Sequence, residues 1–332
     1  MAQTYNKQPK KQRKPVTVRR FLDEGNARGL GLEVVVGEKG LDCVVEEPLL
    51  HRPGLALTGF HKHFANKRIQ VIGQAEHAYL RSLKKHRMKR VKGLFAQEIP
   101  CLVFTRDLSV SEEVREVADE CGITVLRTEM LTLEFMRRAG LLLEDLSAPF
   151  ANLYGTMLEV CGLGVFIEGP SGIGKSETAL GLLKRGHALV ADDLTHIRCM
   201  SNGTLMASAL EQTRGFMEIR GIGLINVRRA FGIGAVRGEK QLDLVVTLKK
   251  WEVKEAKDDK EETEELDRVG TDMECEFLGV KVKHLVLPVA LGRELVNLVE
   301  TAAQEHVLRA SGYFAAEDLD ARVMRHHLEG GK

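Results

Sequence analysis

The sequence predicts an α/β protein with two domains. Its 332 residues are about twice the length of a typical single domain. Over residues 16–146, short apolar segments alternate with helix-like segments, the order that gives parallel sheets covered by helices. Further along, a glycine-rich motif lies between a strand-like and a helix-like segment. We therefore expect an N-terminal α/β domain with a parallel sheet over residues 16–146 and a C-terminal phosphate-binding domain over residues 147–332.

Composition and charge narrow the range of functions. Hydrophobic residues make up 44 % and charged residues 29 % of the chain, which is typical of a folded globular protein. The formal net charge is +1 and no apolar run reaches the ~20 residues of a membrane-spanning helix, so we expect no nucleic-acid or membrane partner. The polar N-terminus and the absence of a C-x-x-C pair predict a cytoplasmic protein without a zinc site. The cysteines are expected to be reduced and mostly buried: Cys43, Cys101, Cys121, Cys161, Cys199 and Cys275.

The first fifteen residues are expected to form a disordered basic tail. Lys, Gln and Pro dominate residues 1–15, and the first twenty residues contain seven basic and no acidic side chains. Such a tail is able to contact an acidic partner, although a solvated arm is the simpler interpretation.

The expected elements of the first domain follow one another as strand and helix. The predicted strands are Leu32–Gly37, Arg68–Gly73, Cys101–Thr105 and Ile123–Leu126. Helices are predicted at Val16–Asn26, Ala75–Leu83 and Leu131–Leu143. A further helix is predicted to begin at a capping box formed by Ser109 and Glu112 and to end at Gly122. No catalytic group of residues is evident in this domain, and a linker is expected over residues 144–152.

The phosphate-binding motif G-x-x-x-x-G-K-[ST] begins the chemistry of the second domain. It consists of Gly169, Pro170, Ser171, Gly172, Ile173, Gly174, Lys175 and Ser176. An apolar strand is expected before it at Leu158–Ile167 and a helix after it at Glu177–Arg185, a context that argues against a chance match. In such a P-loop the backbone N–H groups and the helix N-terminus hold a polyphosphate, while the lysine reaches the β- and γ-phosphates and the hydroxyl binds Mg²⁺. We therefore expect ATP and Mg²⁺ as cofactors, with Lys175 and Ser176 in these roles.

Two adjacent carboxylates follow the next predicted strand. Asp192 and Asp193 end the apolar segment 187–191, only 17 to 18 residues after Lys175. This spacing predicts a strand directly beside the P-loop strand, with the acids close to metal and phosphates. One carboxylate would lie near Mg²⁺ and the other would accept a proton from an attacking hydroxyl. The alternative is a turn or helix-capping role.

The remaining segments of the second domain add fewer candidates. Residues 217–236 contain four glycines between apolar residues, a pattern that indicates a close approach of the backbone to another group. In this segment Glu218 is a candidate metal ligand and Arg220 a candidate phosphate contact. A charge-dense segment, 249–267, is expected to be an exposed, mobile insertion. The last predicted elements are a strand at Val282–Pro288 and helices at Gly292–Arg309 and Ala315–Leu328.

Taken together, these segments resemble the bifunctional HPr kinase/phosphorylase family over nearly the whole chain. The matching segments are Arg52–Leu55, Arg68–Gly73, Gly169–Leu180, Lys184–Asp193 and Met217–Val227. The resemblance implies a C-terminal P-loop kinase domain akin to phosphoenolpyruvate carboxykinase and a homo-oligomer, usually a hexamer. It also implies phosphorylation of a serine on the phosphocarrier protein HPr and reversal of that reaction by phosphorolysis.

The resemblance also implies roles for single residues. Lys175 and Ser176 match the phosphate- and Mg²⁺-binding positions, and Glu218 matches a magnesium ligand. Asp193 matches the base that accepts the proton of the serine hydroxyl, and Arg268 matches the catalytic arginine that stabilises charge on the transferring phosphoryl group.

Five positions depart from the family pattern. Tyr154 replaces an active-site histidine, and Pro170 replaces the usual aspartate of the P-loop. Ala290 and Leu291 replace an arginine and a proline in a loop tied to dephosphorylation, and Glu294 replaces an asparagine. A tyrosine, with an ordinary pKa of about 10, is a poor acid or base near neutral pH. The kinase positions are thus kept, whereas the phosphorylase positions are altered.

Three hypotheses follow from the sequence. The chain is a protein serine kinase acting on HPr, or a P-loop kinase of the same fold with a changed protein or small-molecule substrate, or a non-enzymatic nucleotide sensor. The presence of Lys175, Asp193, Glu218 and Arg268 argues against the sensor, because a sensor has no need of the catalytic set.

Overall fold

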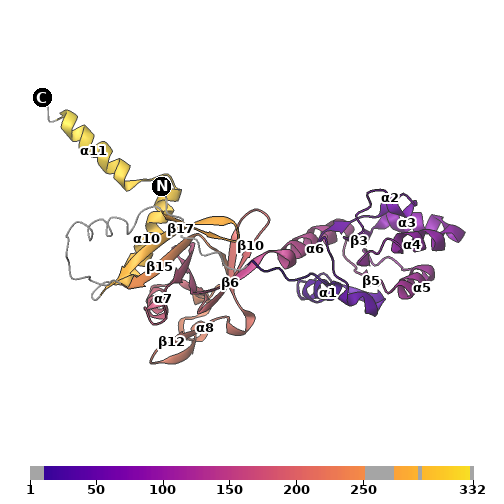
Figure 1. Cartoon of the computed structure of the whole chain (residues 1–332), viewed down its shortest axis with the longest axis horizontal. Helices are drawn as coiled ribbons and strands as arrows, with labels where there is room; N and C mark the ends of the chain where they lie inside the picture. Colours follow the sequence, from indigo (N-terminus) through magenta and orange to yellow (C-terminus); the bar gives the residue numbers. More distant parts are fainter. Residues whose placement is uncertain (1–10, 251–272, 291–293, 330–332) are drawn as a thin grey trace. The chain divides into compact units, whose positions relative to one another are not determined.

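The computed structural model describes residues 11–250, 273–290 and 294–329, and it divides into two compact units (Figure 1). One unit spans residues 13–148, and the other contains residues 149–332 together with the first twelve residues. Within the described residues, no helix combines the length and the apolar character needed to cross a bilayer.

The N-terminal unit is a five-stranded sheet with helices on both faces. The strands are β1 (Glu33–Val36), β2 (Leu50–His51), β3 (Ile69–Ile72), β4 (Cys101–Phe104) and β5 (Thr124–Arg127). Their order in the sheet is β1-β5-β4-β3-β2, in which β2 to β5 are parallel and β1 is antiparallel to β5. The helices are α1 (Val18–Ala27), α2 (Gly54–Leu57), α3 (Gln74–Ser82), α4 (Arg87–Phe95), α5 (Glu112–Cys121) and α6 (Thr132–Ser147).

Two apolar cores lie on opposite faces of this sheet. One contains Phe21 of α1 and Phe135 of α6, and the other contains residues of α2 to α5, such as Leu57, Leu94 and Val117. β3 and β4 are buried along their whole length. The sequence of β4 is accordingly a continuous apolar run, whereas β3 also buries the polar Gln70, whose amide nitrogen donates to the carbonyl oxygens of Ala65 and Arg68.

Several details of this unit differ from the sequence prediction. Helix α4 was not predicted, and the N-cap of α5 is Ser111 rather than Ser109. The expected linker is largely regular structure, because α6 continues to Ser147 and β6 starts at Phe150. Gln12, which lies within the predicted disordered tail, exchanges two backbone hydrogen bonds with Phe150, and residues 1–10 of that tail lie outside the described part.

The described residues of the C-terminal unit form three sheets. A six-stranded sheet has the order β16-β17-β15-β8-β7-β9, a four-stranded sheet has the order β14-β11-β10-β6, and β12 and β13 form a separate hairpin. The strands of the large sheet are β7 (Thr156–Val160), β8 (Leu163–Glu168), β9 (Ala188–Ala191), β15 (Leu244–Lys250), β16 (Met273–Phe277) and β17 (Val280–Val289). The others are β6 (Phe150–Tyr154), β10 (Leu194–Cys199), β11 (Leu205–Ala209), β12 (Phe216–Ile219), β13 (Gly223–Asn226) and β14 (Glu239–Gln241).

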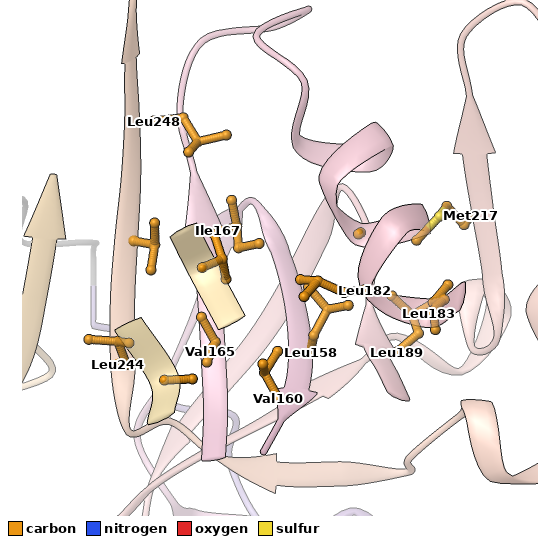
Figure 2. Close-up of a cluster of buried hydrophobic side chains, with 14 of the residues drawn as sticks. Leu158, Val160, Val165, Ile167, Leu182, Leu183, Leu189, Met217, Leu244 and Leu248 are labelled. Atoms are coloured by element: carbon orange, nitrogen blue, oxygen red, sulfur yellow. The ribbon is translucent and has the colours of Figure 1, made fainter. Parts of the chain in front are cut away.

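The α-helices in the described residues of this unit are α7 (Lys175–Lys184), α8 (Val227–Phe231), α10 (Leu295–Ala310) and α11 (Ala315–Glu329). Residues of α7 and α10 pack on one face of the large sheet, and Figure 2 shows Leu182 and Leu183 of α7 together with Val165 and Ile167 of β8. The other face of the large sheet, with Phe166 and Val245, packs on Ile197 and Ala207 of the four-stranded sheet.

The segment predicted as one strand, Leu158–Ile167, is a hairpin of two antiparallel strands. Cys161 and Gly162 form its turn, with φ angles of +52° and +83°. Positive φ at both central residues is the mark of a two-residue hairpin turn that matches strand twist. As a result β7 lies between β8 and β9, and the prediction that the acid pair follows the strand next to the P-loop strand is wrong.

The cysteines are unpaired, but the expectation that most are buried is wrong. Only Cys101 and Cys275 are buried, whereas Cys43, Cys121 and Cys161 are exposed. Burial raises the pKa of the Cys275 thiol to about 12, so this thiol stays protonated at neutral pH.

A close backbone approach at Gly164 gives a stability prediction. A methyl group at this residue would lie 1.8 Å from the carbonyl oxygen of Gln241, a backbone atom that cannot move aside without breaking the sheet. We expect Gly164→Ala to lower the free energy of unfolding of the C-terminal unit by about 3 kcal/mol, measured by urea denaturation. In α6, Gly140 has open space around its methyl position, so Gly140→Ala should instead stabilise its own unit by about 0.5–1 kcal/mol. Unchanged stability of the Gly164→Ala protein would contradict the close packing at this site.

Candidate active site

The P-loop joins the end of β8 to the start of α7. Three of its glycines have left-handed or unusual backbone angles: φ is +154° at Gly169, +77° at Gly172 and +108° at Gly174. A methyl group at Gly169 would lie 2.7 Å from the carbonyl oxygen of Leu248, so this position needs glycine for space as well as for conformation. Gly174 is the N-cap of α7, and the loop therefore ends at a helix N-terminus, which favours anions.

The two cationic side chains of this loop region lie on its surface. Nζ of Lys175 donates to the carbonyl oxygens of Gly169 and Pro170 at 3.0 and 3.1 Å, so the lysine bends back over its own loop. Nη1 of Arg220 would be 3.0 Å from a methyl group at Gly172. Two positive charges thus border a set of backbone N–H groups, an arrangement suited to a polyphosphate.

The acid pair forms a tight turn between β9 and β10. The backbone N–H of Leu194 donates to the carbonyl oxygen of Asp192 at 2.8 Å, and Asp193, between them, has a φ of +62°. Such three-residue turns with positive φ at a non-glycine residue are rare and strained, and strain of this kind concentrates at functional sites. Asp193 is exposed, and the described residues provide no hydrogen-bond donor to its carboxylate that the structure records.

Asp192 has different surroundings from those of its neighbour. Its carboxylate accepts hydrogen bonds from Oγ1 of Thr156 at 2.7 Å and from the backbone N–H of Glu218 at 3.3 Å. Burial raises the pKa of Asp192, and the two donors partly oppose this shift by favouring the charged form. The accepting oxygens of Asp192 are therefore engaged within the protein, whereas Asp193 is available to a substrate.

The β12–β13 hairpin brings the third acid to this region. Met217 and Ile219 are buried, and Figure 2 shows Met217 beside the helix that carries Leu182 and Leu183. Because side chains alternate along a strand, Glu218 points to the exposed side. The turn after β12 carries Arg220 to Gly172 of the P-loop.

The candidate magnesium ligands are few. Ser176 is the second residue of α7 and Glu218 lies on β12. In the part of the chain that the structure describes, no three or more His, Cys, Asp or Glu side chains are grouped so as to hold a metal ion. The hydroxyl of Ser176 and the carboxylate of Glu218 are oxygen donors, the ligand type that Mg²⁺ takes together with waters and substrate phosphates.

The positions that depart from the family pattern are placed as follows. Tyr154 is 77 % exposed and lies directly opposite Leu194, one residue from Asp193. Ala290 follows the end of β17 and Glu294 is the N-cap of α10. Arg268 and Leu291 lie outside the described residues, as does most of the charge-dense segment.

The sequence reasoning missed Thr156 and the role of Asp192 as an internal acceptor. A threonine at the start of an apolar strand carries no signal of its own, because threonine is a common strand residue. The turn at residues 192–194 has no glycine or asparagine to reveal its positive φ.

The comparisons with known proteins agree with one another. The family description "HPr Serine kinase N terminus" matches residues 16–143, and "HPr Serine kinase C-terminal domain" matches residues 145–323. A relative named HPr kinase/phosphorylase from Caldanaerobacter subterraneus is 39 % identical over 300 residues, which is 90 % of this chain and 95 % of the relative. Relatives with the same name from Lachnoclostridium phytofermentans and Leptospira biflexa are 40 % and 38 % identical, over 87 % and 89 % of this chain and 91 % and 90 % of theirs.

Among solved structures, one described as the Hpr(Ser) kinase/phosphatase from Coxiella burnetii is 32 % identical, with a TM-score of 0.43. It covers 51 % of this chain and 97 % of its own length. Because both family descriptions and the full-length relatives extend over nearly all of the sequence, the chain belongs to the HPr kinase/phosphorylase family.

Proposed function

We propose that this chain is an ATP- and Mg²⁺-dependent serine kinase that phosphorylates the phosphocarrier protein HPr. Family membership supports the reaction and the substrate class, since the relatives carry the name HPr kinase/phosphorylase. The observation that carries the proposal is the pairing of a P-loop at the end of β8 with the strained, exposed Asp193 turn that follows β9.

In the forward reaction, Asp193 acts as the general base. Its carboxylate accepts the proton of the HPr serine hydroxyl while the hydroxyl oxygen bonds to the γ-phosphorus and the bond to the leaving ADP oxygen breaks. The exposure of Asp193 supports this role over Asp192, whose carboxylate already accepts two hydrogen bonds from Thr156 and Glu218.

The other side chains hold and neutralise phosphate. Lys175 turns from the carbonyls of Gly169 and Pro170 to the β- and γ-phosphates, and Arg220 contacts phosphate from the hairpin turn. Ser176 and Glu218 would hold Mg²⁺, which would supply positive charge to neutralise the phosphates. Arg268 is assigned to the transferring phosphoryl group by the family resemblance.

Transfer of label from γ-³²P-ATP tests this function directly. We expect purified HPr to be labelled on serine in a Mg²⁺-dependent reaction, with no label when that serine is replaced by alanine. A cell extract is assayed in parallel. Labelling of another protein but not HPr would support the alternative, a kinase of the same fold with a changed substrate, and no labelling at all would support a sensor.

The direction of the reaction is the next prediction, and it concerns Tyr154 and Ala290. In phosphorolysis, inorganic phosphate attacks phosphoserine, so two anionic groups must approach and the serine oxygen must receive a proton. A histidine and an arginine would help both steps, and this chain has neither at these positions. We expect pyrophosphate release from seryl-phosphorylated HPr at millimolar phosphate to be at least about tenfold slower than the forward reaction.

The double change Tyr154→His with Ala290→Arg tests the cause. Tyr154 lies opposite Leu194, the residue after Asp193, so this substitution introduces a titratable imidazole next to the acid turn. The reverse rate should rise while the forward rate stays within about threefold, a smaller change than loss of an acid–base group gives. Equal forward and reverse rates in the unmodified protein, or no gain from the double change, would contradict the assignment.

Finer features rest on the family resemblance and are also proposed. They are assembly as a homo-hexamer, a location in the cytoplasm and a C-terminal fold akin to that of phosphoenolpyruvate carboxykinase. Light scattering coupled to size-exclusion chromatography measures the first of these.

A further inference from the structure

Gly155 and Thr156 form the corner between β6 and β7. This corner binds both aspartates of the acid turn, which is the turn at residues 192–194. The backbone N–H of Gly155 donates to the carbonyl oxygen of Asp193 at 2.9 Å. The next residue, Thr156, donates its hydroxyl to Oδ1 of Asp192 at 2.7 Å. Gly155 and Thr156 therefore each donate a hydrogen bond to one of the two aspartates of the turn.

This corner is itself fixed to the P-loop strand. Thr156 is fully buried and is the register partner of Ile167, two residues before Gly169. Gly155 is packed so closely that a methyl group there would lie 2.7 Å from the carbonyl oxygen of Ile167. The corner has no room to shift relative to β8, so its hydrogen bonds locate the acid turn with respect to the P-loop.

The carboxylate of Asp192 continues the connection to the β12–β13 hairpin. Its Oδ2 accepts the backbone N–H of Glu218 at 3.3 Å, while Oδ1 is held by Thr156. The hydroxyl of Thr156 thus fixes one oxygen of the carboxylate and, through the rigid carboxyl plane, the direction in which the other oxygen faces Glu218. The side chain of Asp192 therefore joins the acid turn to β7, the neighbour of the P-loop strand, and to β12, the strand of the candidate magnesium ligand.

We propose that Thr156 is a positioning residue of the phosphoryl-transfer site, whose hydroxyl orients Asp192 so that Asp193 and Glu218 are held in register with the P-loop. The inference rests on the proposed function for its catalytic consequence, but the connection itself is a property of the folded chain. Loss of the hydroxyl leaves a half-buried carboxylate short of one donor, and it turns toward water or Mg²⁺ to recover that bond. The N–H of Glu218 then loses its acceptor.

Three variants separate positioning from simple packing. Thr156→Val keeps the branched shape but has no hydroxyl, and Thr156→Ser keeps the hydroxyl but has one methyl group fewer. Thr124 of β5 is equally buried, and its hydroxyl donates to the carbonyl oxygen of Gly37 in the other unit, so Thr124→Val controls for the loss of a buried hydroxyl as such.

We expect Thr156→Val to lower kcat for HPr phosphorylation by about tenfold to a hundredfold, with KM for ATP within about threefold, because small displacements of reacting groups cost rate more than binding. Thr156→Ser should retain kcat within about threefold, and Thr124→Val should leave it unchanged. If the valine variant does not fold, Thr156→Ala is measured in its place, with the same expectation.

Hydrogen exchange provides a readout that needs no substrate. The amide of Glu218 should exchange at least about tenfold faster in Thr156→Val than in the unmodified protein, and at the unmodified rate in Thr156→Ser and Thr124→Val, because local opening follows the loss of its acceptor. Unchanged exchange at Glu218, or equal loss of kcat in the serine and valine variants, would overturn the proposal. If the unmodified protein fails to label HPr, the proposed function fails, and the exchange result still decides on the positioning role of Thr156.

Discussion

Replacing Lys175 by alanine should lower kcat/KM for phosphoryl transfer to HPr by at least about a thousandfold, because the reaction depends on positioned charge around the phosphates. In the structure Nζ of Lys175 is held by the carbonyl oxygens of Gly169 and Pro170, at the edge of the loop whose N–H groups would bind phosphate. The fold should survive, since Lys175 is the first residue of α7 and alanine is a good helix former.

The matched control is Lys184→Ala, which removes the same type of side chain from the exposed last turn of the same helix. This control should keep nearly all activity. Rates are measured with labelled ATP, and melting temperatures of both variants verify folding. Retention of more than about a tenth of the unmodified rate by Lys175→Ala would show that the P-loop lysine is not part of the reaction.

Asp193→Asn should abolish HPr phosphorylation while leaving nucleotide binding almost intact. Asparagine has the same shape and tolerates the positive φ of +62° at this position, so the turn is kept while the base is lost. Removal of a general base typically costs about a hundredfold to ten-thousandfold in kcat.

Nucleotide affinity and kcat are measured on the same preparation of the Asp193→Asn protein. The dissociation constant for ATP should change by less than about threefold, because the base contacts the acceptor hydroxyl rather than the nucleotide. Parallel losses of affinity and rate would point to a role of Asp193 in the fold of the turn, and the absence of either loss would exclude it as the base.

The parts of the fold that the sequence predicts well are those in which local chemistry and packing agree. The first unit is an example: Gly122 ends α5 with a φ of +67°, and the segments predicted as strands at residues 68–73 and 101–105 contain the buried strands β3 and β4. The P-loop is likewise a strand, a glycine turn and a helix, because the motif dictates its own backbone.

The errors arise where sheet pairing over long distances decides the structure. The run 158–167 is apolar throughout, so periodicity alone cannot reveal a hairpin within it, and Cys161-Gly162 is not one of the usual turn pairs. Helix α4 was not predicted; four of its nine residues are basic and it contains Gly93, so its apolar residues do not stand out in the sequence.

The candidate site could be predicted from the sequence only in part, because some of its contacts also depend on long-range strand pairing. Motif or family signals mark Lys175, Ser176, Asp193 and Glu218. In the structure Lys175 and Ser176 begin α7 after the P-loop, Asp193 lies in the acid turn, and Glu218 lies on β12. The contacts of Thr156 depend on which strand lies beside which, and this is fixed by the packing of the whole sheet.

The strand inserted between β8 and β9 has an electrostatic consequence. Neighbouring strands lie about 4.8 Å apart, so the ends of β8 and β9, which lead to the P-loop and the acid turn, are separated by about 10 Å. In the structure the ammonium group of Lys175 bends back onto its own loop and forms no recorded ion pair with the carboxylate of Asp193. An ion pair would leave the lysine partly neutralised toward phosphate and the carboxylate a weaker base. The insertion of β7 between β8 and β9 therefore separates the positive charge of Lys175 from the negative charge of Asp193 within one site.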